Sequence, residues 1–486
     1  MRLSLAAAAL ATGAAGMLQP ASASTSTPLP DMASVGRVVQ APAAWSLGAT
    51  GHGVDVALID TGVTPVPGLN GPNKLVYGPD LSFDSQDPNS AYWDGYGHGT
   101  ALAGIIAGND GTTDGYKGIA PEARLVSVKV GASTGAADVS QMIAGIDWVT
   151  QHAHDDGMNI RVLNLSLGTN SVQPYQLDPL AHAAEQAWKH GIVVVVAVGN
   201  DGRNVRTVAD PATDPYLLAV GAEDPNGTIN RDDDTVAPFS QHGTDRRHAD
   251  LVAPGTYVMG LLSPGSVLAN ANPGAVFNNR FLRGSGTSQA AAIVSGVVAD
   301  VLSARPGLSP DQVKALLTST TTDISSSNEN YVGSGLVQAA AAVRNRVPGG
   351  SDQSFPAALG TGSLEQARGD NHVSLGGVAL TGEQDIFGQA WSSGVASAEN
   401  TASAWNGGVF NGSTWSGSTW SGSTWSGSTW SGSTWSGSTW SGSTWSGSTW
   451  SGSTWSGSTW SGSTWSGSTW SGSTWSGDVW MGATWT

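Results

Sequence analysis

The sequence predicts an α/β fold in which a mostly parallel sheet carries helices on both faces. From about residue 51 to residue 221, short β-branched runs alternate with longer amphipathic stretches, and turns rich in Gly, Asn, Asp and Pro separate them. This alternation is typical of parallel strands buried between two layers of helices. In such sheets the chemistry gathers at the carboxyl ends of the strands.

Five apolar runs are the expected strands, at residues 54–59, 124–130, 161–167, 192–198 and 216–221. One helix is expected around residues 139–149, where apolar side chains recur at helical spacing. Another is expected over residues 178–190, because Gly191 suits the end of a helix. Two more should begin near Ser288 and after Ser309.

The globular domain is expected over residues 45–347, between segments of different composition. Residues 1–23 have a positive start, an apolar run and a small-x-small site, which predict a cleaved secretory signal, and residues 24–44 form a short N-terminal segment. Residues 348–410 are expected to be a linker and a Gly-rich region. No later run reaches about 18 uninterrupted apolar residues, so no membrane span is expected. The sequence thus predicts an extracellular protein.

Residues 411–486 are pentapeptide repeats. Thirteen consecutive copies of Ser-Gly-Ser-Thr-Trp, the first beginning with Asn411, precede two degenerate copies that end at Trp480 and Trp485. A period of five fits neither a helix nor a flat strand. The unit is similar to the pentapeptide pattern that stacks as a square β-solenoid, and a disordered Gly/Ser tract with spaced aromatic side chains is an equal alternative.

Charge and cysteine content exclude several classes. The formal net charge is −17 with only 20 Lys and Arg, which argues against a nucleic acid or an anionic membrane as partner, because both require a basic patch. The chain has no cysteine, so it forms no disulfides, although an extracellular location would permit them.

Two polar residues follow apolar or glycine-rich runs in a way that suits catalysis. Asp60 ends the run Val-Ala-Leu-Ile-Asp at a turn, where a carboxylate either caps its own turn or holds a histidine in one tautomer. His98 lies between Gly97 and Gly99 and opens a helix of small residues, a setting that favours function over a structural role.

Ser288 and Asn200 complete the set of candidates. Ser288 lies where a Gly-rich segment enters a helix, so it is either an N-cap or a hydroxyl near unpaired N–H groups. A serine hydroxyl becomes a good nucleophile only beside a base that a carboxylate orients. Asn200 ends a buried valine run, where its amide either makes a turn or donates to a developing oxyanion.

Together these motifs resemble the subtilisin (subtilase) family of serine peptidases, over roughly residues 45–341. The order Asp, His, Asn, Ser matches, as do Gly-Ile-Ala-Pro at residues 118–121 and Leu-Val-Ala-Pro-Gly at residues 251–255. The resemblance implies a subtilisin-like fold and a secreted endopeptidase in which His98 takes the Ser288 proton, Asp60 steadies the imidazolium and Asn200 binds the oxyanion. Such an endopeptidase needs no cofactor for catalysis, and its partners are protein or peptide substrates.

The resemblance also assigns a substrate pocket. Its walls would be Ser166, Leu167 and Gly168 on one side and Ala197, Val198 and Gly199 on the other. Because these residues are uncharged, the pocket should prefer apolar or aromatic side chains. Three departures stand out: Ala101 replaces the family's second histidine, Ala292 replaces a proline, and only about twenty residues occupy the place of the usual folded propeptide.

Two further interpretations stay open. Members of the family commonly bind structural calcium, and the loop of residues 109–115, with Asp110 and Asp114, suits either a hard cation or a solvated turn. A second functional hypothesis is a disabled protease-like scaffold whose tryptophan array binds a cell wall or polysaccharide at the cell surface. The presence of all four candidate residues favours the enzyme.

Overall fold

A computed structural model describes residues 31–405, apart from residues 87–89, 325–327, 376–377, 387–389 and 393, together with short backbone segments between residues 414 and 485. The expected signal sequence lies outside the described residues.

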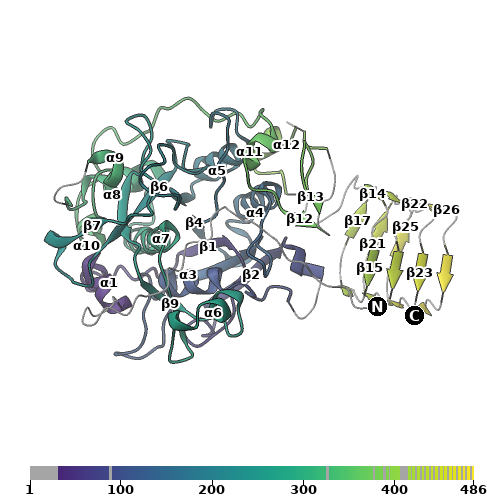
Figure 1. The fold of residues 1–486 in the computed structure, drawn as a ribbon, viewed down its shortest axis with the longest axis horizontal. Coiled ribbons are helices and arrows are strands. Elements are labelled where there is room, and N and C mark those ends of the chain that lie inside the picture. Colours follow the sequence, from purple (N-terminus) through teal and green to yellow (C-terminus); the bar gives the residue numbers. More distant parts are fainter. Residues whose placement is uncertain are drawn as a thin grey trace.

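The predicted parallel sheet is present at the centre of the domain (Figure 1). Its strand order is β2-β3-β1-β4-β5-β6-β7, with β8 beside β6, and β7 runs antiparallel to β6. All six residues of β1 are buried, because the strand has neighbours on both sides and helices on both faces. The strands are β1 (Asp55–Asp60), β2 (Leu75–Asp80), β3 (Arg124–Lys129), β4 (Ile160–Leu165), β5 (Val193–Ala197), β6 (Leu218–Asp224), β7 (Thr235–Val236) and β8 (Leu251–Pro254).

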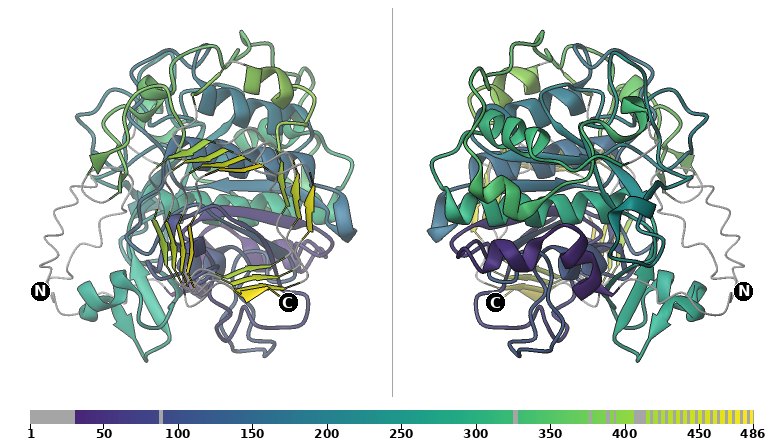
Figure 2. Two further views of the ribbon diagram at one scale, coloured as in Figure 1. Left: turned by 90° about the vertical axis from the view of Figure 1, so that its right-hand side faces the viewer. Right: turned by 90° about the vertical axis from the view of Figure 1, so that its left-hand side faces the viewer.

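Helices cover both faces of this sheet (Figure 2). In the chain, helix α3 lies between β2 and β3, and helix α4 lies between β3 and β4. Helix α3 packs against α7, and α4 packs against α5. These helices are α3 (His98–Ala107), α4 (Val139–Gln151), α5 (Pro179–Lys189) and α7 (Thr287–Ala304).

Helices α4, α5 and α8 (Pro310–Ser319) begin where the sequence predicts, because polar caps fix their first turns. Asp138 and Gln141 form a capping box at α4, and Ser309 and Gln312 form another at α8. The Asp178 carboxylate caps α5. Helix α7 is long and apolar enough to cross a membrane, but 89% of its apolar window is buried in the domain, as expected of a core helix.

Shorter elements surround the sheet, and apart from α8 the sequence patterns do not predict them. An antiparallel sheet of order β10-β11-β9 lies beside α3. The remaining elements are α1 (Met32–Val38), α2 (Ala41–Trp45), α6 (Val267–Ala271), α8 (Pro310–Ser319), α9 (Glu329–Val332), α10 (Ala339–Arg344), α11 (Leu364–Arg368), α12 (Gly394–Glu399), β9 (Val258–Leu261), β10 (Val276–Phe277), β11 (Phe281–Gly284), β12 (Ser374–Leu375), β13 (Val378–Ala379) and the 3-10 turns η1 (Phe83–Gln86), η2 (Asp155–Gly157), η3 (Arg231–Asp233) and η4 (Pro273–Ala275).

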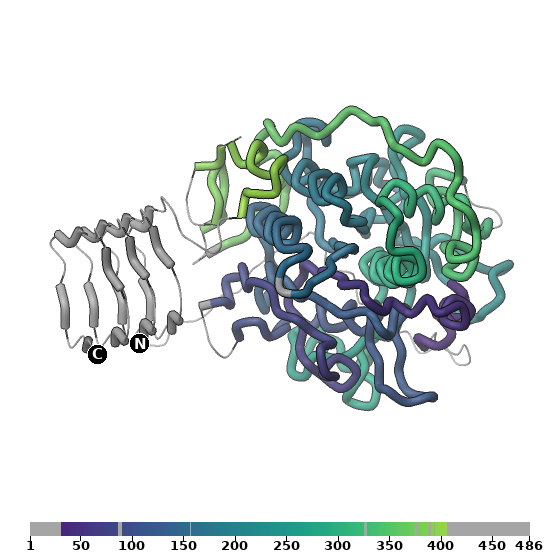
Figure 3. Tube along the Cα trace, turned by 180° about the vertical axis from the view of Figure 1, so that it is seen from behind, coloured from purple at the N-terminus to yellow at the C-terminus, as the bar shows by residue number. Residues whose placement is uncertain are grey.

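The segment after residue 348, expected to be a linker, packs on the domain. Helix α11 contacts α4 and α5, and α12 contacts α5 (Figure 3). Leu364 and Ala367 are part of the main hydrophobic core, and the Ala358 N–H donates to the Glu185 carboxylate at 2.6 Å. This segment therefore contributes to the same folded body.

The repeats form short strands that pair at a fixed interval. Each strand lies parallel and in register with the strand four repeats later, for example β14 with β18 and β15 with β19, which gives four columns. Strands β14 (Thr414–Ser416) through β26 (Thr474–Ser476) each comprise Thr-Trp-Ser, followed by β27 (Val479–Met481) and β28 (Thr484–Trp485).

Several carboxyl groups are buried without a donor among the described residues. Both oxygens of Glu223, Asp234 and Asp300 lack a hydrogen-bond partner. Burial, reinforced by the charge of Asp233, raises the pKa of Asp234 to about 7. Burial and the charge of Glu185 raise the pKa of Asp214 to about 8. These carboxyl groups therefore stay protonated in the folded protein at pH values at which they are ionised in the unfolded chain.

We expect the free energy of unfolding to fall as pH rises from about 4 to about 8. The stability from a carboxyl with a raised pKa is complete below its unfolded pKa, near 4, and is lost as pH passes the folded value. Urea unfolding of the Ser288→Ala protein, which prevents self-digestion, measures the slope. Asp214→Asn and Asp234→Asn should flatten it, whereas Asp155→Asn, at an exposed site, should not. Equal slopes in all four proteins would contradict the expectation.

Candidate active site

Asp60 and His98 form a buried pair at the carboxyl end of β1. The Asp60 carboxylate is 1% exposed and contacts His98 Nδ1 through both oxygens, at 2.8 and 3.0 Å. The Thr61 N–H also donates to Asp60, at 2.7 Å. A carboxylate bound to Nδ1 keeps a proton there and leaves Nε2 as the ring's basic atom. Burial lowers the pKa of His98, but the charges of Asp60 and Asp94 outweigh burial and raise it above the ordinary value.

Small residues let the histidine helix approach the turn after β1. A Cβ on Gly99 would lie 2.1 Å from the Gly62 carbonyl oxygen, so only glycine fits there. Gly97, immediately before α3, has φ of 103°, which favours glycine. The two glycines beside His98 therefore serve the close contact between α3 and β1, as their position in the sequence suggests.

Asp94 is a second carboxylate at this site, and the sequence patterns did not single it out. It is fully buried and accepts hydrogen bonds from the Gly97 N–H, the Thr100 N–H and the Thr61 hydroxyl, at 2.7, 2.7 and 2.8 Å. It thus binds the first turn of α3 and the turn after β1 together. The available signal was its position four residues before His98, where an acid can cap a helix N-terminus.

Ser288 is the second residue of α7 and is 1% exposed. Its hydroxyl donates to the Ser166 carbonyl at 3.3 Å, and the Ser166 hydroxyl donates to the Ser288 carbonyl at the same distance. His98 Nε2 has no hydrogen-bond partner within the described part of the chain. The serine hydroxyl and the imidazole are therefore not hydrogen bonded in this structure.

Asn200 follows β5 and is joined to the residue before Ser288. Its Oδ1 accepts from the Thr287 N–H at 2.8 Å and from the Thr287 hydroxyl at 3.0 Å. With the oxygen occupied in this way, the Asn200 amide N–H2 is the group that remains for a ligand. Gly199 has φ of 106°, and a Cβ there would lie 1.7 Å from Gln241 Oε1, so this turn also requires glycine.

The expected pocket walls lie at the ends of neighbouring strands. Ser166, Leu167 and Gly168 follow β4, and Ala197, Val198 and Gly199 end or follow β5, the parallel neighbour of β4. The Ser166 hydroxyl accepts from the Asn164 amide at 3.0 Å. The Val198 side chain is wholly buried in the hydrophobic core, so this residue can line a pocket only with its backbone.

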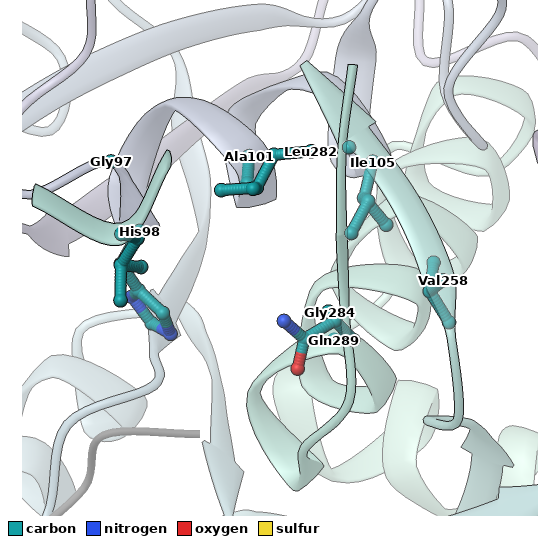
Figure 4. Close-up of a pocket in the computed structure, with 10 residues that line it drawn as sticks. Gly97, His98, Ala101, Ile105, Val258, Leu282, Gly284 and Gln289 are labelled. Carbon is teal, nitrogen blue, oxygen red and sulfur yellow. The ribbon is translucent and has the colours of Figure 1, made fainter. Parts of the chain in front are cut away.

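A small cavity adjoins His98 on the side of α7 (Figure 4). Its lining is mostly apolar and includes Ala101, Leu268 and Leu282. His98 and Gln289 lie across the cavity from each other, and Gln289 Oε1, like His98 Nε2, is buried without a partner among the described residues. Two helical residues, Ala101 and Ala292, depart from the family pattern. Because the Ala101 side chain is small, it leaves open space beside the imidazole. Ala292 is buried in α7.

The loop with Asp110 and Asp114 does not fit a calcium ion at Asp110. That carboxylate forms an ion pair with Arg280 and accepts the Tyr116 N–H at 2.8 Å. The Asn109 amide oxygen accepts the Gly111 N–H at 2.8 Å. An arginine thus supplies the positive charge that a cation would bring, and no cluster of three acidic or histidine ligands occurs among the described residues.

These features define an α/β protein with a carboxylate–histidine pair and a serine at one edge of a parallel sheet, and comparison with known proteins identifies its family. The sequence model of the Subtilase family matches residues 51–362, so the chain belongs to that family. It is 37% identical over 307 residues to serine protease AprX of Bacillus subtilis, which covers 62% of this chain and 67% of that protein. It is 39% identical over 306 residues to subtilisin Savinase of Lederbergia lenta, covering 63% of this chain and 96% of that protein.

A solved structure is also similar. Fervidolysin from Fervidobacterium pennivorans, a keratinolytic enzyme related to subtilisin, matches with a TM-score of 0.52 and 28% identity, over 65% of this chain and 46% of that one. The chain thus spans under half the length of that protein. These relatives show that the protein is a serine endopeptidase of the subtilase family, and they confirm the predicted subtilisin-like α/β fold.

Replacing Asp94 should move the pH dependence of the enzyme. Asp94→Asn removes a negative charge that helps to raise the pKa of His98, so the acid limb of kcat/KM should shift to lower pH. Asparagine keeps only one of the two acceptor oxygens, so one of the Gly97 and Thr100 N–H groups loses its acceptor, which should lower stability by about 1 to 3 kcal/mol. A pH–rate profile measures the first effect and urea unfolding the second. Asp155→Asn is the control, and an unshifted profile in a folded Asp94→Asn protein would leave Asp94 a purely structural role.

Proposed function

We propose that this protein hydrolyses peptide bonds through an acyl-enzyme on Ser288, with His98 as general base and Asp60 as its orienting carboxylate. The observation that carries the proposal is the buried contact of Asp60 with His98 Nδ1, which leaves Nε2 to accept a proton. For the attack, the Ser288 hydroxyl would exchange its hydrogen bond to the Ser166 carbonyl for one to Nε2. Such contacts often tighten only when substrate binds.

In the attack, Ser288 Oγ forms a bond to the substrate carbonyl carbon and His98 Nε2 takes the hydroxyl proton. The Ser288 N–H and the Asn200 amide hold the oxyanion, and the contact of Asn200 with Thr287 supports this placement. His98 then gives the proton to the leaving amine. Water attacks the acyl-enzyme with the same base and releases Ser288.

Residues 166–168 and 197–199 would line the pocket for the side chain before the cleaved bond. Their uncharged character supports a preference for apolar or aromatic side chains. The substrates would be extracellular proteins or peptides, since residues 1–23 have the pattern of a secretory signal. If calcium binds, it binds as a structural ion away from Asp110, and it takes no part in the chemistry.

For the repeats we propose a four-sided solenoid. Strand pairing at intervals of four repeats supports it, because each repeat then forms one side of a coil. Regularly placed indoles would suit contact with sugars of a cell wall or polysaccharide. Deleting residues 406–486 should remove a β-type component from the far-UV circular dichroism spectrum and abolish binding to insoluble glycans. A lost component of random-coil type would contradict the solenoid, and retained glycan binding would contradict the adhesive role.

Ser288→Ala should lower kcat for peptide hydrolysis by about 10⁶-fold, because it removes the nucleophile, and it should prevent labelling by a phosphonofluoridate. Absence of labelling in well-folded wild-type protein would favour the disabled scaffold instead. Cleavage-site profiling of wild type beside Ser288→Ala would define the pocket's preference.

Asn200→Ala should lower kcat by about 10² to 10³-fold with little change in KM, the size found when such a donor is removed from a subtilisin. Thr287→Val is the matched variant, because it removes the hydroxyl contact to Asn200 Oδ1 but keeps the amide donor. Equal losses in the two variants would show that Asn200 acts by packing, not by binding the oxyanion.

A further inference from the structure

The segment around α11 lies directly against the loop that follows β4. The Thr169 hydroxyl donates to the Ala367 carbonyl at 2.5 Å, and the Asn371 amide donates to the Gly168 carbonyl at 3.2 Å. The Val172 N–H donates to the Gln366 carbonyl at 3.2 Å. Residues about 200 positions apart in the sequence therefore share a set of hydrogen bonds beside Ser166.

A buried arginine anchors the same segment to a second loop. Arg368 is 0% exposed, and its guanidinium contacts the Asp138 carboxylate at 2.7 Å. Asp138 caps α4 and follows the loop after β3. Arg368 also donates to the Gly382 carbonyl at 2.6 Å. Because removal of one partner of a buried ion pair is costly, this anchor fixes α11 relative to the sheet.

The packing leaves the loop little freedom. Gly369 has φ of 60°, and a Cβ there would lie 2.2 Å from the Asn170 carbonyl oxygen. On its other side, Thr169 pairs with Asp210 through two backbone hydrogen bonds of 2.9 and 2.8 Å. A Cβ on Gly168 would lie 2.7 Å from the Asp210 carbonyl oxygen. The loop is therefore held between the turn at Asp210 and the α11 segment.

We propose that residues 363–373 position the substrate-pocket wall of Ser166, Leu167 and Gly168, with Asn371 and the Ala367 carbonyl as the positioning groups. This rests on the proposed role of that wall in binding substrate. Without the α11 contacts, only the turn at Asp210 would hold the wall, and the wall would sample more conformations. Substrate binding would then have to order the wall, which weakens binding. These contacts include neither His98 nor Ser288, so their loss should weaken binding much more than the chemical step.

The test uses the full chain and isosteric replacements. Thr169→Val removes the hydroxyl that donates to Ala367, whereas Thr169→Ser keeps it. Each of Thr169→Val and Asn371→Ala should raise KM about five-fold, the equivalent of one lost hydrogen bond, with kcat changed less than two-fold. The rise should be larger for a substrate with Phe before the cleaved bond than for one with Ala. Thr169→Ser should behave as wild type.

Asn170→Ala is the control within the same loop, because it removes only the exposed contact to Asp370 and should leave KM unchanged. Phosphonofluoridate labelling of Ser288 should proceed at the wild-type rate in every variant. Wild-type KM in Thr169→Val and Asn371→Ala overturns the inference. If Thr169→Val is unfolded at the assay temperature, Asn371→Ala decides the question by the same criterion. Failure of wild type to label at Ser288 contradicts the proposed function instead, so the two failures are distinguishable.

Discussion

The contact between the Asp60 carboxylate and the His98 imidazole is the constraint on which the rest of the site depends. Two polar groups are buried there, and burial is tolerable because they hydrogen bond to each other and the Thr61 N–H also donates to Asp60. The surrounding sequence serves this contact. Gly99 lets α3 reach the turn after β1, and Asp94 binds both elements. A Cβ at Gly99 would lie 2.1 Å from the Gly62 carbonyl oxygen and 3.1 Å from an Asp60 carboxylate oxygen, so a larger residue there would push α3 away from Asp60.

The sheet topology explains why the serine and the asparagine lie at the same edge of the sheet as this pair. Strands β1, β4 and β5 are parallel neighbours, so their carboxyl ends form one edge of the sheet. Asp60 ends β1, Ser166 follows β4 and Asn200 follows β5. Helix α7 packs along the same strands and brings Ser288 to the edge, where Thr287 binds Asn200. The site therefore follows from strand order as much as from any single motif.

Away from the active site, the excess of acidic over basic residues affects how charge is buried in the domain. The chain has nearly twice as many acidic as basic residues, 37 against 20, so some buried carboxyls have no cation to pair with. Asp214 and Asp234 are buried among other acids, and a bound proton replaces the missing cation. At Asp110 the reverse holds, because Arg280 forms an ion pair with a carboxylate that the sequence offered either to calcium or to solvent. Stability without disulfides thus comes from packing and from a few buried ion pairs such as Arg368 with Asp138.

The sequence by itself determined five strands of the central sheet, the starts of α4, α5 and α8, and the family, because apolar periodicity, capping residues and ordered motifs are local signals. It did not identify β2, β7 or β8, which belong to the same sheet. It could not determine the role of Asp94, the ion pair at Asp110 or the attachment of α11 to the loop after β4. Each of these joins residues whose partners lie elsewhere in the chain, such as Arg280 for Asp110 and Thr169 for Ala367. Such contacts exist only after the chain has folded, when buried polar groups must find partners among whatever residues packing has brought near.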